Sequence, residues 1–168
     1  ARPHLMRLLG SGSGGLLVPG LGINASISPI AAQPGKIALV AQSASVTTAI
    51  IDRAASTGVG FSTIVHLGAS LDIDLADVID WLADDPDTER ILVQFDSVAA
   101  GRKFMSAARA AARNKPVVAI RAGRLATVPV GGTPFSSPRF GSGAFDRVFT
   151  VGSDLAFARH GQYPPLTS

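Results

Sequence analysis

Short apolar runs alternate with amphipathic stretches between residues 34 and 124. Four runs have the length and composition of strands buried on both faces of a sheet: Lys36–Ala41, Phe61–Leu67, Arg90–Phe95 and Val117–Ile120. Three stretches between them place apolar residues at helical spacing: Thr47–Ala55, Leu75–Ala83 and Gly101–Arg113. This alternation suits right-handed crossovers between strands, so the sequence predicts an α/β three-layer sandwich with a parallel sheet.

The two ends of the chain lack this regularity. Residues 1–35 are rich in Gly, Pro and Ser, and no strand-turn-helix unit surrounds Gly10–Gly15. We therefore expect a flexible connector there rather than a dinucleotide-binding loop. Leu125–Gly143 has a similar composition, and one short helix is expected at Ala144–Phe149. Irregular N- and C-terminal extensions are thus predicted around the regular part.

Composition removes several classes of function. The 168 residues are 46% hydrophobic and 16% charged, which indicates a real core, and no apolar run approaches the length of a membrane span. The net charge of +3 is small, no basic run occurs, and one Trp and one Tyr are present, so nucleic-acid binding is not expected. The absence of cysteine fits a reducing compartment, and we expect a cytoplasmic protein with neither nucleic acid nor membrane as partner.

The clearest candidate site is the turn Gln42-Ser43-Ala44-Ser45, between the first predicted strand and helix. A helix that begins just past the carboxyl end of a buried parallel strand favours anions, because its first N–H groups are free and its dipole is positive there. The alternative is that Ser43 or Ser45 only caps the helix.

Three further groups of polar residues are candidates besides that turn. Asp96 ends the third predicted strand, so it should lie beside the turn if the first and third strands are neighbours. A carboxylate there can orient a cationic or imidazole group, and the alternative is an exposed strand-end cap. Eight of the twelve acids lie between Asp72 and Glu89 without a basic residue among them. A solvated helix face explains that acidic cluster better than a metal site does. His66 ends the second strand and can reach the same edge, although a satisfied surface histidine is the commoner case.

The residues themselves resemble a known family. PGKIALVAQSAS, then TGVGFSTIVHLGASLDIDLADVIDWLADDPDTERILVQFDSV and GRKFMSAARAAARNKPVVAIRAGR, are similar to the succinyl-CoA-ligase-like flavodoxin domain of NDP-forming (ADP-forming) acyl-CoA synthetases and their acetyltransferase-fused relatives. The resemblance divides the chain into 1–33, an exit segment from a preceding CoA-binding domain or a linker; 34–124, the flavodoxin-like domain; and 125–168, the loop-rich remainder with a degenerate phosphohistidine loop.

The resemblance implies a reaction and its participants. Such enzymes exchange acyl-CoA, phosphate and a nucleotide through a phosphorylated histidine, whose phosphate lies on the helix N-terminus after the turn. The resemblance assigns phosphate binding to Gln42, Ser43, Ala44 and Ser45. It also implies that Asp96 is the partner of the histidine. CoA or acyl-CoA and ADP or ATP are the implied cofactors. Other domains or subunits of the same synthetase are the implied partners: CoA-binding, ATP-grasp and acyltransferase.

The sequence departs from the family pattern at positions that carry the family's chemistry. Ala44 replaces the glycine of the turn, Asp96 replaces a glutamate, and Ala69 replaces an asparagine. The phosphohistidine loop falls near Pro134-Phe135-Ser136, and Arg124–Ser142 contains no histidine. We therefore expect a binding, regulatory or scaffold role without the phosphohistidine step.

Two alternatives stay open. One is an active acid-CoA ligase whose phosphoryl acceptor is supplied elsewhere, by His66 or by a partner subunit. The other is an interaction or oligomerisation module, in which Leu125–Gly143 and the phenylalanines between Phe135 and Phe157 dock another domain or a second copy.

Overall fold

The computed structural model describes residues 6–27, 31–121, 147–151 and 155–159, and for Arg121 and the last two ranges it describes the backbone alone. These residues form one eight-stranded sheet in the order β2-β1-β4-β3-β5-β6-β7-β8. The strands are β1 (Gly15–Val18), β2 (Ile23–Ser26), β3 (Pro34–Ala41), β4 (Phe61–His66), β5 (Arg90–Phe95), β6 (Val117–Arg121), β7 (Arg147–Val151) and β8 (Leu155–Arg159). The helices are α1 (Ala44–Thr57), α2 (Leu75–Asp84), α3 (Gly101–Ala111) and the 3-10 turn η2 (Pro19–Leu21).

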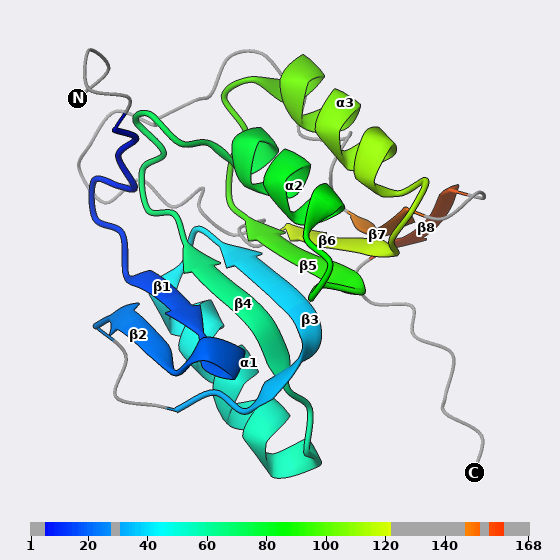
Figure 1. The fold of residues 1–168 in the computed structure, drawn as a ribbon. Helices are drawn as coiled ribbons and strands as arrows, with labels where there is room; N and C mark the ends of the chain where they lie inside the picture. Colours follow the sequence, from blue (N-terminus) through cyan, green and yellow to red (C-terminus); the bar gives the residue numbers. More distant parts are fainter. Residues whose placement is uncertain (1–5, 28–30, 122–146, 152–154, 160–168) are drawn as a thin grey trace, which may run out of the picture.

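The α/β fold with helices on both faces of the sheet is confirmed. The four central strands, β4-β3-β5-β6, are parallel, as predicted. The outer pairs are antiparallel, so the whole sheet is mixed rather than parallel. In Figure 1, α2 and α3 lie together on one face of the sheet and α1 lies on the other.

Two apolar clusters match these two faces. Alternation along β3 sends Ala38 and Val40 to the cluster under α2 and α3, and Leu39 and Ala41 to the cluster under α1. All four side chains are fully buried. The near-continuous apolar character of β3 in the sequence follows from this double coverage.

Helix caps explain where the helices begin and end. Ser43 is the N-cap of α1, its Oγ accepts a long hydrogen bond (3.5 Å) from the Val46 N–H, and Gly58 ends the helix in the left-handed conformation with φ 71°. Asp74 and Asp77 form a reciprocal capping box at the start of α2. The dipole role expected for part of the acidic cluster is therefore realised.

The expectation of an irregular connector at residues 1–35 is wrong for residues 15–26. These residues form the β1–β2 hairpin, and β1 extends the sheet beside β4. The preceding glycines also pack rather than link: Ser11 O accepts from Ala69 N at 2.8 Å and Gly10 O accepts from Leu71 N at 2.9 Å. Composition alone missed this because glycines that permit close backbone approach look the same as glycines of a linker.

The expected helix at Ala144–Phe149 is also wrong where it is described, because residues 147–149 belong to β7. That strand pairs with β6, with Val117 opposite Val151. Alternating β-branched and aromatic residues in RVFTV favour a strand once a partner edge is available. The loop expected at Leu125–Gly143 lies outside the described residues, and the domain boundaries stay predictions.

The acidic cluster acquires basic partners from distant parts of the chain. Lys103 of α3 contacts Asp77 at 2.7 Å and Asp74 at 2.9 Å. Arg7 contacts Asp72 at 3.2 Å and Asp77 at 3.1 Å. The acidic cluster is therefore not only a solvated helix face, because three of its carboxylates link the N-terminal segment, α2 and α3 through ion pairs.

This network predicts a pH dependence. Burial alone would raise the pKa of Asp77, but hydrogen bonds from Lys103, the Asp74 backbone and Arg7 together lower it. A carboxyl group whose pKa is lower in the folded state than in the unfolded state stabilises the fold at any pH above its unfolded-state pKa. This stabilisation is lost as the pH falls through the folded-state pKa. Urea unfolding should therefore find wild type more stable than Asp77→Asn near neutral pH. The gap should narrow as the pH falls below about 4, the ordinary range of an aspartate pKa. A gap that stays constant over that range would contradict the assignment.

Candidate functional site

The predicted site lies at the carboxyl ends of β3 and β5. These two strands are parallel neighbours, with Ala41 opposite Gln94, so the turn after β3 and the loop after β5 meet. The Gln42 side chain crosses between them: its Oε1 accepts from the N–H groups of Asp96 at 2.9 Å and Ser97 at 3.2 Å, and its Nε2 donates to Ser97 O at 3.0 Å. The expected proximity of Asp96 to the turn is therefore observed.

Ser43, Ala44 and Ser45 form the start of α1. The Ser43 and Ser45 hydroxyl groups lie 3.1 Å apart and hydrogen-bond to each other. Ala44 does not have a positive φ. Among the described residues other than glycine, that conformation is found at Ser70. Alanine thus fits the turn without backbone strain. The first N–H groups of any helix lack intrahelical acceptors, so this end of α1 has the donors that an anion needs.

Gln94 is the residue of this edge that sequence reasoning missed. It is fully buried, and its Oε1 accepts from the N–H groups of Ser43 at 3.0 Å and Gln42 at 3.2 Å. Its Nε2 donates to Asp96 Oδ1 at 3.0 Å. A signal was present, since a glutamine interrupts the apolar run ILVQF, and a buried amide needs partners for all its polar atoms.

His66 is buried, with 7% of its surface exposed, rather than being a surface residue. Its Nδ1 accepts a hydrogen bond from the Gly14 N–H, which requires that nitrogen to be unprotonated. Its Nε2 therefore carries the proton and donates it to Gln42 O at 3.0 Å. Both ring nitrogens are occupied by backbone groups, an arrangement that suits a structural histidine and leaves no lone pair for a nucleophile.

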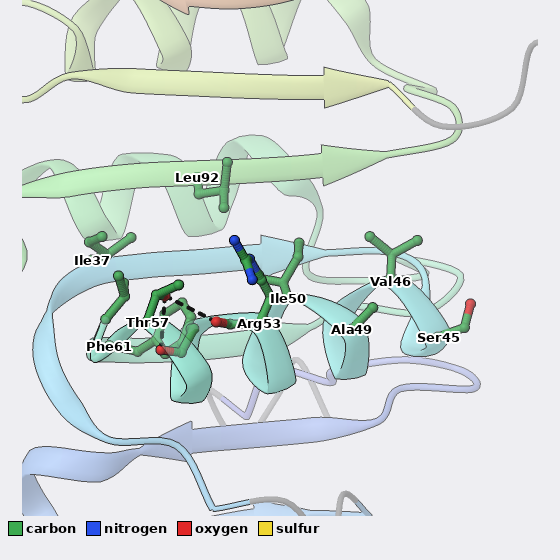
Figure 2. A pocket seen from close by; sticks show the side chains of 11 residues that line it. Ile37, Ser45, Val46, Ala49, Ile50, Arg53, Thr57, Phe61 and Leu92 are labelled. Atoms are coloured by element: carbon green, nitrogen blue, oxygen red, sulfur yellow. Dashed lines mark hydrogen bonds between the residues drawn. The ribbon is translucent and has the colours of Figure 1, made fainter. Parts of the chain in front are cut away.

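A separate apolar groove of about 510 Å³ runs along α1. Figure 2 shows Val46, Ile50 and Arg53 projecting from α1 into the groove, opposite Leu92 of β5. Ile37 and Phe61 line its far end, and Ser45 lies at the end next to the carboxyl edge. The groove thus shares Ser45 with the candidate site, but its walls carry few polar groups.

Neither a metal cluster nor a membrane helix is found in the part of the chain that the structure describes. No group of three or more His, Cys, Asp or Glu residues there is arranged to hold a metal ion. None of the described helices is long and apolar enough to cross a membrane.

The fold and the edge together define an α/β domain with a strand-turn-helix unit at its carboxyl edge and a carboxylate at the end of the neighbouring strand. The chain belongs to the family of the succinyl-CoA ligase like flavodoxin domain, whose model matches residues 34–129. The resemblance seen in the sequence is thereby confirmed.

Relatives and solved structures agree with this family. The alpha subunit of ADP-forming acetate–CoA ligase I from Pyrococcus furiosus is 32% identical over 95% of this chain and 37% of that protein. ADP-forming acetate–CoA ligase I from Archaeoglobus fulgidus is 37% identical over 74% of this chain and 18% of that protein. The dinucleotide-forming acetyl-coenzyme A synthetase 1 of Ca. Korarchaeum cryptofilum, solved in complex with phosphate and ADP, has a TM-score of 0.69 and 30% identity, covering 74% of this chain and 27% of that chain. This chain therefore spans well under half the length of each of these relatives.

Proposed function

We propose that this chain is the flavodoxin-like part of an acyl-CoA synthetase (NDP-forming) type protein that has lost the phosphohistidine step and serves a binding, regulatory or scaffold role. The observation that carries the proposal is the lack of histidine in Arg124–Ser142, where the family's phosphoryl acceptor would fall. Proline, phenylalanine and serine at 134–136 offer no imidazole to phosphorylate.

The surroundings of the remaining groups support the same proposal. Asp96, the candidate partner of a histidine, has its Oδ1 bonded to Gln94, which leaves Oδ2 as its acceptor for another donor. His66, the histidine nearest to the edge among the described residues, has both ring nitrogens bonded to backbone groups. The fold is thus kept while the histidine that would accept a phosphoryl group is missing from the loop, and His66 does not offer a free ring nitrogen in its place.

The ligands and partners follow from the relatives' names and belong to the proposal. CoA or acyl-CoA is the ligand that a non-catalytic relative of a CoA ligase would retain, with ADP or ATP bound by other parts of the assembly. CoA-binding, ATP-grasp or acyltransferase domains, in the same chain or in another subunit, are the partners. The alpha-subunit relative and the small share of each relative that this chain spans support partners of this kind.

Incubation of the full-length protein with acetyl-CoA, ADP and phosphate is expected to yield no ATP above background. The Pyrococcus furiosus acetate–CoA ligase serves as the positive control in the same assay. Calorimetry with CoA tests the retained binding role separately. Sustained ATP formation by this protein would overturn the proposal, and absence of CoA binding would remove the ligand part of it.

An active ligase with its acceptor on a partner subunit is the second candidate, favoured by the retention of Ser43, Ser45 and Asp96 at one edge. Acid-labile phosphate on the partner, formed from labelled ATP only when this chain is present, would support that candidate. A third candidate is an interaction module for another domain of the synthetase or a homo-oligomer, favoured by the apolar groove along α1. A strictly monomeric elution profile together with no binding to the separate synthetase domains would argue against it.

A further inference from the structure

Two glutamines at the carboxyl edge bind each other's strands reciprocally. Gln42, at the end of β3, satisfies the backbone of Asp96 and Ser97 after β5. Gln94, in β5, satisfies the backbone N–H groups of Gln42 and Ser43 after β3. Five hydrogen bonds thus join the two strand ends, and a sixth, from Gln94 to Asp96, lies within the end of β5. We call this arrangement the glutamine clasp.

The clasp uses every polar atom of the Gln94 side chain. Gln94 is 0% exposed, so an unsatisfied carbonyl or amino group there would destabilise the fold. The carbonyl oxygen takes two N–H groups of the turn, and the amino group takes one carboxylate oxygen. A leucine or methionine of similar volume would fill the same space, so packing alone does not explain an amide at this position.

The glutamine clasp orients Asp96. Its backbone N–H is held by Gln42 Oε1 and its Oδ1 by Gln94 Nε2, so main chain and side chain are both oriented. Asp96 is nevertheless an exposed residue, and within the described ranges no hydrogen bond reaches its Oδ2. One oxygen of the carboxylate is therefore bonded to a buried side chain, and the other has no hydrogen-bond partner among the described residues.

We propose that Gln94 is a positioning residue, which holds Asp96 so that Oδ2 is presented as a preformed acceptor beside the start of α1. The class of group that this acceptor takes is an N–H or O–H donor, because an ionised carboxylate only accepts hydrogen bonds. The proposal deepens the proposed function and rests on it for the view that this edge is the binding site. The orientation of Asp96 itself does not depend on that view.

The test uses NMR on the full chain with Gln94→Met and a matched control, Gln33→Met. Gln33 is exposed, so the same substitution there removes no clasp contact. Couplings from the Asp96 carboxyl carbon to its amide nitrogen and carbonyl carbon report the χ1 rotamer. Wild type and Gln33→Met should show a single Asp96 rotamer, whereas Gln94→Met should show rotamer averaging. Hydrogen exchange at the Ser43 amide should rise at least about tenfold in Gln94→Met, while exchange at Thr63 in β4 stays unchanged.

A second variant separates orientation from packing. In Gln94→Glu the carboxylate can still accept from Ser43, but it cannot donate to Asp96 and repels it when both are ionised. The titratable groups that meet the clasp are Asp96 and, through Gln42 O, His66. Asp96 should therefore show rotamer averaging at neutral pH in this variant, as in Gln94→Met.

The outcomes decide between a positioning role and a packing role. A single Asp96 rotamer in Gln94→Met, or in Gln94→Glu at neutral pH, would overturn the proposal. If Gln94→Met does not fold, the rotamer measurement on Gln94→Glu at neutral pH gives the answer alone. The ATP assay tests the proposed function independently. A protein that makes ATP can still have Asp96 held by Gln94, and a protein that makes no ATP can have an Asp96 that is not held.

Discussion

Replacing His66 with alanine is expected to lower the free energy of unfolding by about 3 kcal/mol, without removing any phosphoryl acceptor. The imidazole is buried and bridges two segments that are far apart in sequence, Gly14 and Gln42. Alanine would leave a cavity, and it would leave the buried Gly14 N–H and the partly buried Gln42 carbonyl without these partners. The loss therefore combines a packing effect with two unmade hydrogen bonds.

Urea unfolding of His66→Ala and His66→Gln measures this effect. Glutamine can restore a hydrogen bond to either Gly14 or Gln42, so it should recover part of the lost stability. Incubation of wild type with labelled ATP should leave no acid-labile phosphate on His66. A variant as stable as wild type, or a phosphate found on His66, would contradict the structural role and would revive the active-ligase alternative.

Gly15→Ala is expected to destabilise the protein by roughly 3 kcal/mol or more, and to do so through the β1–β2 hairpin. Gly15 has φ 95°, a conformation that alanine rarely adopts. An added Cβ would also lie 2.1 Å from Ala25 O and 2.7 Å from Ser26 Cα, both backbone atoms that cannot move aside easily. Strain and steric overlap act together at this position.

Gly20→Ala is the matched control, because an added Cβ there meets no atom within 4 Å. Urea unfolding should separate the two variants clearly. Limited proteolysis should also show faster cleavage within residues 15–27 of Gly15→Ala only. Equal stability of the two variants would mean that residues 15–26 do not form the hairpin.

The central elements were predictable because each carries its own pattern. Arg90–Phe95 was predicted with the observed bounds of β5, and the other central strands and the three helices differ from prediction only at their ends. The adjacency of Asp96 and the turn at Gln42 was expected on the condition that the two strands are neighbours, and the pairing of β3 with β5 meets that condition. Membership of the family was likewise evident from the run of residues between 34 and 124.

The environments of single polar residues were not predictable in the same way. His66 was expected at the surface, but Gly14 arrives from the N-terminal segment and covers its ring. Arg7 and Lys103 pair with an acidic cluster that has no basic residue within it. In each case the partner lies far away along the chain, so no local pattern contains the interaction.

The sequence by itself determined the α/β class, the central strands and helices, and the family, because periodicity and strand-end turns are local properties. The tertiary structure alone decided that the glycine-rich segment packs, that His66 is buried, and that Gln42 and Gln94 bind each other's strands. The physical reason is that hydrogen-bond partners for buried polar groups come from neighbours in space. Those neighbours exist only once β1, β3, β4 and β5 lie side by side.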